Sequence, residues 1–377
     1  MALEAVQDPA AAARPQKPPR MMSIDALRGF DMFWIVGGKE VFAALVALLC
    51  YPMGVPGWLD HQLEHVEWTG FAAWDLIMPL FLFVSGASIP FAFAVKPGEK
   101  RNHAAIYRRM ARRVLLLWVL GMVAQGHLLE MDWTKLHFFS NTLQAIAVGY
   151  VIASAAFLHL RLRGQLLLCA GLLTAYWLLM MFVPVPGAGG WLLQPHANLA
   201  MWLDETVLGR FRDGTTYAWI LPGLGFGGSV LLGSFAGQMM RAEWKPARRL
   251  LALAAAGLAC LAGGWLWGLH FPVIKHLWTS SMVLWAGGWS FLLLAFFYLV
   301  VDVWKWQWWA YPFVVIGANA ITVYLGAHIV DFEGLARKIP FLGVETVGTN
   351  LIAALLAFLC VWVPLWLMYR WKIFIRV

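Results

Sequence analysis

The chain has 377 residues, of which 61% are hydrophobic and only 13% are charged, and its mean hydropathy is +0.69. Soluble domains carry about a quarter of their residues as charged side chains, so this composition excludes a soluble globular protein and indicates a polytopic membrane protein. The net charge of +8 reflects where the loops lie relative to the membrane, and it gives no reason to expect a nucleic-acid partner.

Ten stretches are long and apolar enough to be membrane-spanning helices. Lipid cannot hydrogen-bond exposed backbone groups, so a span needs about 20 mostly apolar residues in a helix. Two of the stretches have polar interruptions: the third contains Gln125 and His127, and the fourth opens on Ser140, Asn141 and Gln144. The prediction is an all-α membrane protein with about ten transmembrane helices, at 26–49, 71–95, 114–131, 138–160, 165–184, 217–240, 249–269, 279–302, 310–330 and 349–370.

The start of the chain differs in composition from the rest. Residues 1–22 are rich in Ala, Pro and Gln and lack the apolar core of a signal peptide. We predict a disordered cytoplasmic tail at 1–22 and a single transmembrane domain at 23–377. The four cysteines are far apart and form no CxxC pair, so we expect them to be core residues without a disulfide or metal role.

The distribution of basic residues predicts the orientation. Lys and Arg resist translocation, so the loops richest in them remain in the cytoplasm. With ten spans and both termini cytoplasmic, the inner segments hold most of the 28 basic residues. This arrangement puts the loop at 96–113 in the cytoplasm and His65 outside. The outer side keeps Lys39, Lys135, Arg210, Arg212, Lys275, Arg337 and Lys338.

The connector between the first two spans concentrates titratable side chains. His65 lies in it, and Asp75 follows about one turn into the second span. A carboxylate can fix the tautomer of a histidine and raise the basicity of the other ring nitrogen, which favours a general base. Two other roles for Asp75 stay open, a salt bridge to Lys39 and a contact with the N-terminus of its helix. His61 and His65 have a spacing that can bind zinc, but the HExxH pattern and a third ligand are missing, so we expect no metal.

Charged residues in the first span need an explanation. Lys39 and Glu40 follow Gly37 and Gly38, and a lone charge at the bilayer centre costs about 2.5–3.5 kcal/mol. They should therefore face a water-filled cavity, or form a pair that reaches the outer interface.

Short motifs follow one another in a fixed order along the chain, at 22–30, 65–71, 75–83, 142–147, 275–281, 301–303 and 317–324. This ordered set resembles the heparan-α-glucosaminide N-acetyltransferase family, which comprises transmembrane amino-sugar acetyltransferases of animal lysosomes and bacteria. The resemblance extends over about residues 22 to 330, and the chain is identified as a bacterial member.

The resemblance implies a reaction. Family members pass the acetyl group of cytoplasmic acetyl-CoA to the amine of glucosamine, or of a glucosamine-containing sugar, on the far side of the membrane. For a bacterial member this side is the periplasmic side of the inner membrane. The family's essential histidine corresponds to His65, its aspartate to Asp75, and its Gly-Gly-Lys to Gly37, Gly38 and Lys39.

Two departures from the animal enzymes limit this implication. An asparagine that precedes their glycine run is replaced here by 33–36, Phe-Trp-Ile-Val. The large lumenal domain and extra first span of the animal enzymes also have no counterpart, so recognition of a long polysaccharide is less expected.

The resemblance and the residues together suggest roles. We expect His65 to deprotonate the acceptor ammonium and Asp75 to orient the imidazole or hold Lys39. For the cofactor we expect Arg28, Arg109, Arg112, Arg113 and Gln144. For the acceptor we expect Lys39, Glu40, Asn141, Lys275, Trp278 and Asn319, and the amides are also candidate donors to the thioester oxygen. Alternatively, Arg28 pairs only with Asp25, and the 108–113 cluster is ordinary cytoplasmic charge.

Other functions stay open. His65 could accept the acetyl group itself and form an acetyl-imidazole. An amino-sugar transporter could use Lys39, Glu40 and Asp75 as a coupling relay. A third alternative is an O-acyltransferase that acts on an envelope glycan. The sequence names neither the natural acceptor nor the oligomeric state, a homo-oligomer included.

Overall fold

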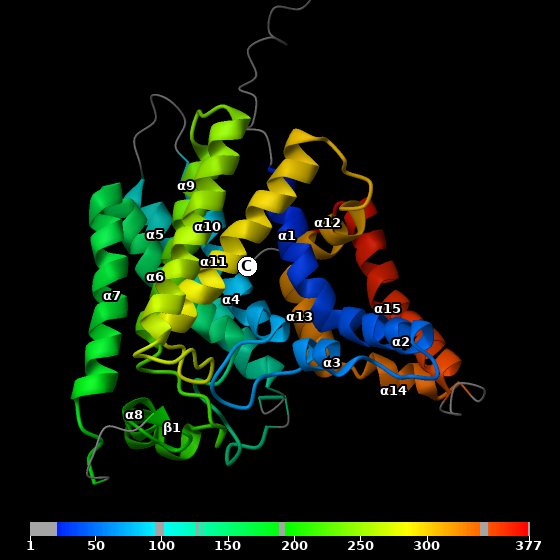
Figure 1. The fold of residues 1–377 in the computed structure, drawn as a ribbon, viewed down its shortest axis with the longest axis horizontal. Coiled ribbons are helices and arrows are strands. Elements are labelled where there is room, and N and C mark those ends of the chain that lie inside the picture. The colour runs from blue at the N-terminus through cyan, green and yellow to red at the C-terminus, as the bar shows by residue number, and fades with distance from the viewer. Residues whose placement is uncertain are drawn as a thin grey trace, which may run out of the picture.

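The computed structural model describes residues 21–94, 102–125, 128, 129, 131–187, 193–339 and 346–375. Within these residues the fold is helical, and the only sheet is a small antiparallel pair, β1 (Leu193–Gln194) and β2 (Ala197–Asn198). The predicted all-α membrane fold is confirmed (Figure 1). The predicted tail lies outside the described residues, except for Met21 and for Met22, which begins the first helix.

Each of the ten predicted spans overlaps a helix. The helices, including 3-10 and π segments (η), are α1 (Met22–Phe33), η2 (Trp34–Gly38), α2 (Lys39–Leu49), α3 (Gly57–Leu63), η3 (Ala73–Leu76), α4 (Ile77–Ala92), α5 (His103–Ala124), α6 (Thr142–His159), α7 (Leu162–Phe182), α8 (Leu199–Leu208), η4 (Gly209–Phe211), α9 (Gly223–Arg241), α10 (Pro246–Gly268), α11 (Ser280–Phe297), η5 (Tyr298–Val303), α12 (Tyr311–Ala318), α13 (Ala320–Ile329), α14 (Phe332–Arg337) and α15 (Val347–Arg370).

Fewer than ten of these helices are long and apolar enough to cross a membrane by themselves. Seven helical segments in the described part of the chain meet that test, and three of them join elements given separately above: Met22–Leu49 (α1, η2 and α2), Ala73–Ala92 (η3 and α4) and Ser280–Val303 (α11 and η5). An eighth meets it if α12 and α13, bent by 79° at Asn319, count as one broken span. The other two predicted spans correspond to α5 and α9. The first half of α5 carries arginines, and the helix ends at Ala124 although the predicted span ran to 131. Nearly all of the glycine-rich α9 is buried by protein, so it needs no lipid-facing apolar side chains.

Glycines set the closest helix contacts. A Cβ added to Gly86 of α4 would lie 2.0 Å from the carbonyl oxygen of Val230 in α9, and one added to Gly29 of α1 would lie 1.6 Å from that of Phe313 in α12. Only glycine permits backbones to approach this closely. These contacts fix α4, which lines both cavities described below, and α1, which lines one of them.

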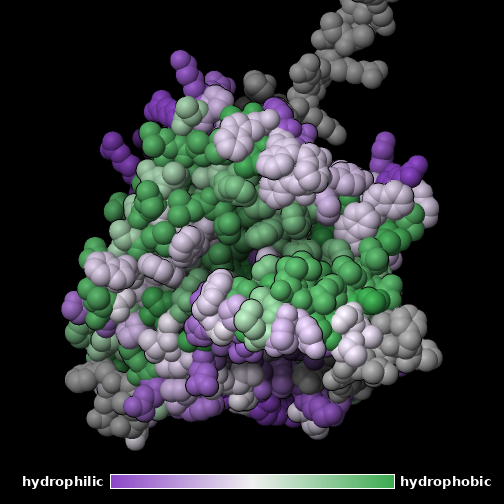
Figure 2. Space-filling model, turned by 45° about the vertical axis from the view of Figure 1, so that its right-hand side comes forward, coloured by the Kyte–Doolittle hydropathy of each residue, from purple (hydrophilic) through white to green (hydrophobic). Residues whose placement is uncertain are grey.

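The bundle has two chemically different ends. At the upper end in Figure 1, which we call the basic end, α5, the α9–α10 connection and the end of α15 carry exposed arginines such as Arg108, Arg248 and Arg370. The opposite end, which we call the loop end, holds α3, α8, β1 and α14. Figure 2 shows a hydrophobic band between two ends where hydrophilic residues gather, as expected for a protein that crosses a bilayer.

The motif that contains Lys39 lies at a break between α1 and α2. Val36 and Gly37 have non-helical backbone angles, and Gly37 has φ +113°, which an L side chain rarely adopts. As a result α2 leaves the direction of α1 and runs across the loop end of the bundle (Figure 1).

Candidate active site

Three loops meet at the loop end of the bundle. They connect α3 to η3 (64–72), η4 to α9 (212–222) and α10 to α11 (269–279). The amide of Gly70 donates to the carbonyl of Val273 at 2.9 Å, and the amide of Ala218 donates to the carbonyl of His276 at 3.0 Å. Gly70 has φ +125°, so glycine suits this junction. The third loop therefore connects the other two.

His65 and Asp75 form the predicted pair. Nδ1 of His65 lies 2.7 Å from Oδ1 of Asp75, and the other carboxylate oxygen accepts from the amides of Val66 at 3.3 Å and Ala72 at 3.1 Å. The Asp75 side chain is 1% exposed and that of His65 is 47% exposed. With Nδ1–H directed to the carboxylate, the lone pair of His65 is on Nε2.

Lys275 completes the pair from a distant part of the chain. Its Nζ lies 3.2 Å from Oδ1 of Asp75 and 3.0 Å from Nδ1 of His65. One Nδ1 cannot both donate to the carboxylate and accept from the ammonium. We assign the proton to the shorter contact, so Lys275 donates to Asp75. Burial lowers the pKa of Lys275, and the Asp75 carboxylate opposes this shift. The ion-pair partner of Asp75 in the structure is thus Lys275, where the sequence suggested Lys39.

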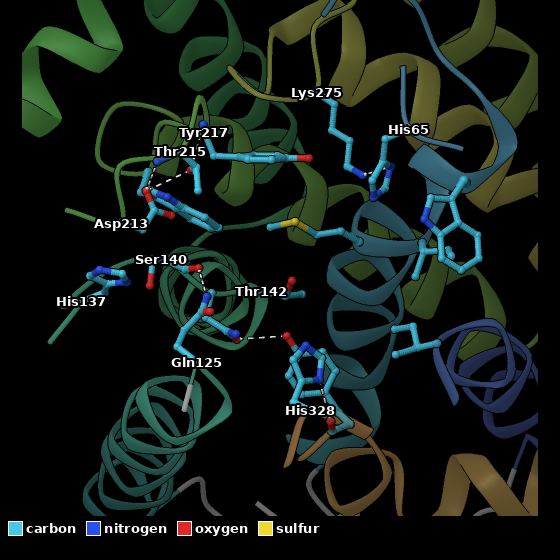
Figure 3. Close-up of a pocket in the computed structure, with 17 residues that line it drawn as sticks. His65, Gln125, His137, Ser140, Thr142, Asp213, Thr215, Tyr217, Lys275 and His328 are labelled. Atoms are coloured by element: carbon cyan, nitrogen blue, oxygen red, sulfur yellow. Dashed lines mark hydrogen bonds between the residues drawn. The ribbon is translucent and has the colours of Figure 1, made fainter. Parts of the chain in front are cut away.

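A first cavity, of about 460 Å³, opens beside His65. We call it the loop-end cavity, or loop-end chamber. Figure 3 shows His65 and Lys275 together at one side of it and Asp213, Thr215 and His137 at the other. Most of the groups around it are polar or aromatic, which suits a small hydroxylated molecule. The lining residues are Ile35, His65, Trp74, Ile77, Met78, Gln125, His137, Ser140, Asn141, Thr142, Asp213, Thr215, Tyr217, Trp219, Lys275, Tyr324 and His328.

The aromatic wall of this cavity is held by buried polar contacts. The Tyr217 ring stacks on His276 with centroids 4.1 Å apart, and the hydroxyl of Thr216 lies 2.7 Å from His276 Nδ1. Burial lowers the pKa of His276 to about 4, which keeps it neutral at physiological pH, and burial raises the pKa of Tyr217 to about 12. Asp204 of α8 accepts from the amide of Trp219 at 2.7 Å. Rings suited to contact a sugar face are therefore fixed in place.

A second cavity, of about 250 Å³, lies toward the basic end. Two arginines line it among mostly apolar side chains. The guanidinium of Arg28 donates to the hydroxyl of Ser88 at 2.7 Å and pairs with Asp25 at 3.3 Å, while that of Arg113 lies 4.3 Å from the centroid of the Tyr150 ring. The lining residues are Arg28, Phe81, Val84, Ser85, Ser88, Arg113, Leu117, Leu143, Ile146, Gly317, Ala318, Ala320, Ile321 and Ile375.

The two cavities follow one another along the same three helices. On α4, Met78 lines the first and Phe81 the second; on α6, Thr142 is followed by Leu143; and on α13, Ile321 lines the second and Tyr324 the first. The rings of Phe81 and Tyr324 have centroids 6.5 Å apart. Side chains in contact therefore separate a polar chamber at the loop end from a chamber with arginines that lies closer to the basic end.

The remaining residues predicted for the cofactor lie around the second cavity or away from it. Arg109 and Arg112 are on the exposed face of α5 and do not line it. Gln144 is buried outside both cavities, where it accepts from the amide of Ser140 and donates to the carbonyl of Phe138. It shapes the loop that supplies Ser140 and Asn141 to the first cavity.

The residues predicted for the acceptor also separate. Asn141 lines the first cavity and caps α6 through the amide of Leu143. Lys39 lies over the ring of Trp74, 4.6 Å from its centroid, but does not itself line that cavity. Glu40 lines a different, smaller pocket of about 160 Å³.

Two further predicted acceptor residues lie outside the first cavity. Trp278 is buried and donates to the hydroxyl of Ser229 at 3.0 Å. Asn319, at the bend between α12 and α13, bonds the backbone of Ile373 and Ile375.

Several lining residues were missed by the sequence reasoning. They are isolated polar residues in loops or at helix ends, and no local spacing marks them. Gln125 also lines the cavity, and the sequence did mark it, as a polar interruption of a predicted span. Its side-chain amide donates to the carbonyl of Ser140. Among the described residues, no group of three or more His, Cys, Asp or Glu side chains could hold a metal ion. The missed residues include His137, Asp213, Thr215, Tyr217, Trp219 and His328.

Comparisons with known proteins agree with the motifs. Residues 20–159 match the family model described as "Domain of unknown function (DUF5009)". The chain is 24% identical to the heparan-alpha-glucosaminide N-acetyltransferase of Homo sapiens over 83% of its length, and 24% identical to that of Mus musculus over 78%. It spans about half the length of these relatives, 53% in each alignment. These similarities support membership of the transmembrane acyltransferase-like family that includes heparan-α-glucosaminide N-acetyltransferase.

Proposed function

We propose that the protein is a transmembrane acetyltransferase that moves an acetyl group from acetyl-CoA to the amine of glucosamine or a glucosamine-containing sugar. The observation that carries this proposal is the cluster of Lys275, Asp75 and His65, which are all in mutual contact at the wall of the loop-end cavity, with a second, arginine-lined cavity along the same helices. The human and mouse relatives are named as N-acetyltransferases, which supports the reaction class.

The first step is a proton transfer. His65 Nε2 takes a proton from the acceptor ammonium, and Asp75 stabilises the resulting imidazolium while holding its ring. The ammonium of Lys275 keeps Asp75 as a charged acceptor. General base catalysis of this kind contributes about 10² to 10⁴ in rate.

The second step is the acyl transfer. The freed amine attacks the thioester carbonyl, a C–N bond forms, the C–S bond breaks, and the imidazolium returns its proton to the departing thiolate. The nitrogen that has formed the C–N bond loses its second proton to water at the open side of the cavity. An ammonium and a thioester thus give an amide, a free thiol and one released proton, with no change of oxidation state. Asn141 and Tyr324, which both line the loop-end cavity, are candidate donors to the carbonyl oxygen.

The acceptor fits the loop-end cavity. Asp213, Thr215 and His137 offer hydrogen bonds for sugar hydroxyls, and Trp219 and Trp74 offer rings for the apolar sugar face. A cavity of about 460 Å³ suits one sugar ring or a terminal sugar with its linkage, not a long buried chain. We infer that free glucosamine or a glucosamine end group is the acceptor.

The donor fits the basic end. Arg28 and Arg113 would bind phosphate oxygens, and the apolar walls between them and Phe81 would hold the thin thioester arm. From Ser88 to Ile77, α4 covers roughly 16 Å at 1.5 Å per residue, so a thioester could reach the loop-end cavity while the nucleotide stays at the basic end. With Lys and Arg retained inside, the basic end is cytoplasmic and the loop end is periplasmic in a bacterial inner membrane.

The test is an acceptor screen with the purified protein in detergent. Acetyl-CoA and glucosamine should give N-acetylglucosamine and free CoA, and the His65→Ala variant should lose this activity. His61→Ala is the matched control, because His61 is exposed on α3 four residues earlier and lines neither cavity. Acetyl transfer to sugars without an amine would indicate an O-acyltransferase, and solute flux without acetyl-CoA would indicate a transporter.

We favour direct transfer over an acetyl-histidine intermediate. Nearly half of the His65 side chain is exposed, so an acetyl-imidazole there would meet hydrolysing water. Incubation with labelled acetyl-CoA alone separates the two routes. A stable stoichiometric acetyl adduct on His65 would contradict direct transfer and leave the overall reaction unchanged.

A further inference from the structure

A third cavity lies away from both chambers and shares no lining residue with them. We call it the lateral groove. Its volume is about 630 Å³, and it runs between α7, α9, α10 and α11. Leu162 and Leu166 on its edge are 52% and 48% exposed, so the groove opens on the outside of the bundle. Its walls are Leu162, Leu166, Cys169, Ala170, Leu173, Leu232, Phe235, Gln238, Met239, Ala242, Trp244, Ala256, Ala259, Cys260, Trp267, Leu284 and Phe291.

The length of the groove matches one leaflet of a membrane. Its lining extends from Leu162 to Leu173 on α7 and from Ala256 to Trp267 on α10. Each stretch covers roughly 16 Å at 1.5 Å per residue, about half of a 30 Å hydrocarbon core. Almost every wall is aliphatic or aromatic, which suits a hydrocarbon chain and no soluble polar molecule.

The mouth of the groove at the basic end is positively charged. Arg248 lies over Trp244, a mouth residue, with its guanidinium 4.8 Å from the ring centroid. Arg249 donates to the carbonyl of Ala242, another mouth residue, at 2.6 Å. Arg161 and Arg163 flank Leu162 on the opposite edge and are exposed. Cations thus stand on both sides of the point where an apolar chain would enter.

We propose that the lateral groove binds an acidic phospholipid. One acyl chain occupies the groove, and the phosphate lies between Arg163 and Arg248 at its mouth. Guanidinium groups bind phosphate oxygens in a bidentate manner. A phosphocholine headgroup also carries a cation that the arginines would repel, whereas an acidic headgroup carries none. Trp244 occupies the interface between chain and headgroup, where amphipathic rings prefer to lie. The site goes beyond the proposed acetyl transfer and does not depend on it.

Native mass spectrometry of the full chain in detergent tests the proposal. Phosphatidylglycerol and phosphatidylcholine with identical acyl chains are titrated separately. The wild type should retain phosphatidylglycerol about tenfold more tightly, and the Arg163→Gln/Arg248→Gln variant should bind the two lipids alike. The matched control is Arg370→Gln/Lys372→Gln, which also removes two cations at the basic end, one of them 5.4 Å from the Trp366 ring. The control should keep the wild-type preference.

A groove-filling variant, Ala170→Phe/Ala256→Phe, should lose both lipids. Equal retention of the two lipids by the wild type would overturn the proposal. It would also be overturned if the control variant lost the preference as much as the Arg163→Gln/Arg248→Gln variant, because that result would indicate bulk electrostatics. Displacement of phosphatidylglycerol by inorganic phosphate would indicate an anion site without a chain, and a dimer mass that excludes lipid would indicate that a second copy covers the groove. If the filled variant does not fold, the arginine variants still decide the question.

Discussion

The two chambers on α4, α6 and α13 are built in different ways. The loop-end chamber owes its chemistry to three loops, and its main side chain, His65, is half exposed but held by the buried Asp75 and Lys275. The chamber toward the basic end has helical walls and few polar groups besides Arg28 and Arg113. A reaction that moves protons needs preorganised polar groups beside water, whereas a thin arm needs only a dry passage with charge at its entrance. The difference suggests that the loop-end chamber performs the chemistry and that the chamber toward the basic end binds the donor.

The largest expected effect tests the chemical half of this comparison. His65→Ala should lower kcat by about 10² to 10⁴, because it removes the proton acceptor. Affinity for acetyl-CoA, measured by isothermal titration, should stay close to wild type because His65 does not line the second chamber. A comparable loss of acetyl-CoA affinity would show that the two chambers are not separate in function.

The next effect concerns the support of His65. Asp75→Asn should reduce kcat by at least about 10²-fold, because the ring loses its charged partner, and should cost about 3–5 kcal/mol in stability, because Lys275 is left buried and unpaired. Adding Lys275→Met to Asp75→Asn should recover much of the unfolding midpoint but not the activity. Recovery of both would mean that the pair is structural only.

Arginine variants test the other half of the comparison, the binding of the donor by the chamber toward the basic end. Arg28→Gln should raise the KM for acetyl-CoA about tenfold with little change in kcat, because it removes a phosphate contact of about 1.4 kcal/mol. Arg112→Gln is the control, since Arg112 is exposed on α5 outside the chamber, and its KM should stay within about twofold of wild type. Equal effects from both variants would favour a diffuse effect of positive charge at the basic end over a specific site.

The smallest effect is a dependence of stability on pH at the wall of the loop-end chamber. Burial lowers the pKa of His276 from 6.5 to about 4. Between these values the unfolded chain binds a proton that the folded protein does not, so the contribution of His276 to stability is present above pH 6.5 and is lost as the pH falls toward 4. His276→Phe keeps a ring against Tyr217 and should show a smaller fall in unfolding midpoint between pH 7 and 5. An unchanged fall would assign the effect to other groups.

The sequence predicted the positions of the helices better than it predicted how many of them span the membrane independently. Hydropathy located a helix in each predicted segment, because a membrane helix must satisfy its own backbone and keep apolar side chains outward. It overcounted independent spans where tertiary burial replaces lipid, as in α9, and where Asn319 divides one segment into two helices. Neither effect is visible in a window of about 20 residues.

The candidate site shows the same limit. His65 and Asp75 could be paired from sequence because ten positions separate them, but Lys275 lies 200 positions beyond Asp75 and was expected to contact substrate. Among the arginines of α5, only the structure distinguishes Arg113, which lines a chamber, from Arg112, which does not.

The sequence by itself determined the membrane class, the helical segments and the histidine with its nearest acid, since these depend on composition and local spacing. The tertiary structure alone decided the partner of Asp75, the polar wall of loop residues and the alignment of two chambers on shared helices. Loops carry no periodicity, and their contacts depend on helices that approach closely only at glycines such as Gly29 and Gly86. Those contacts exist only once the bundle is assembled.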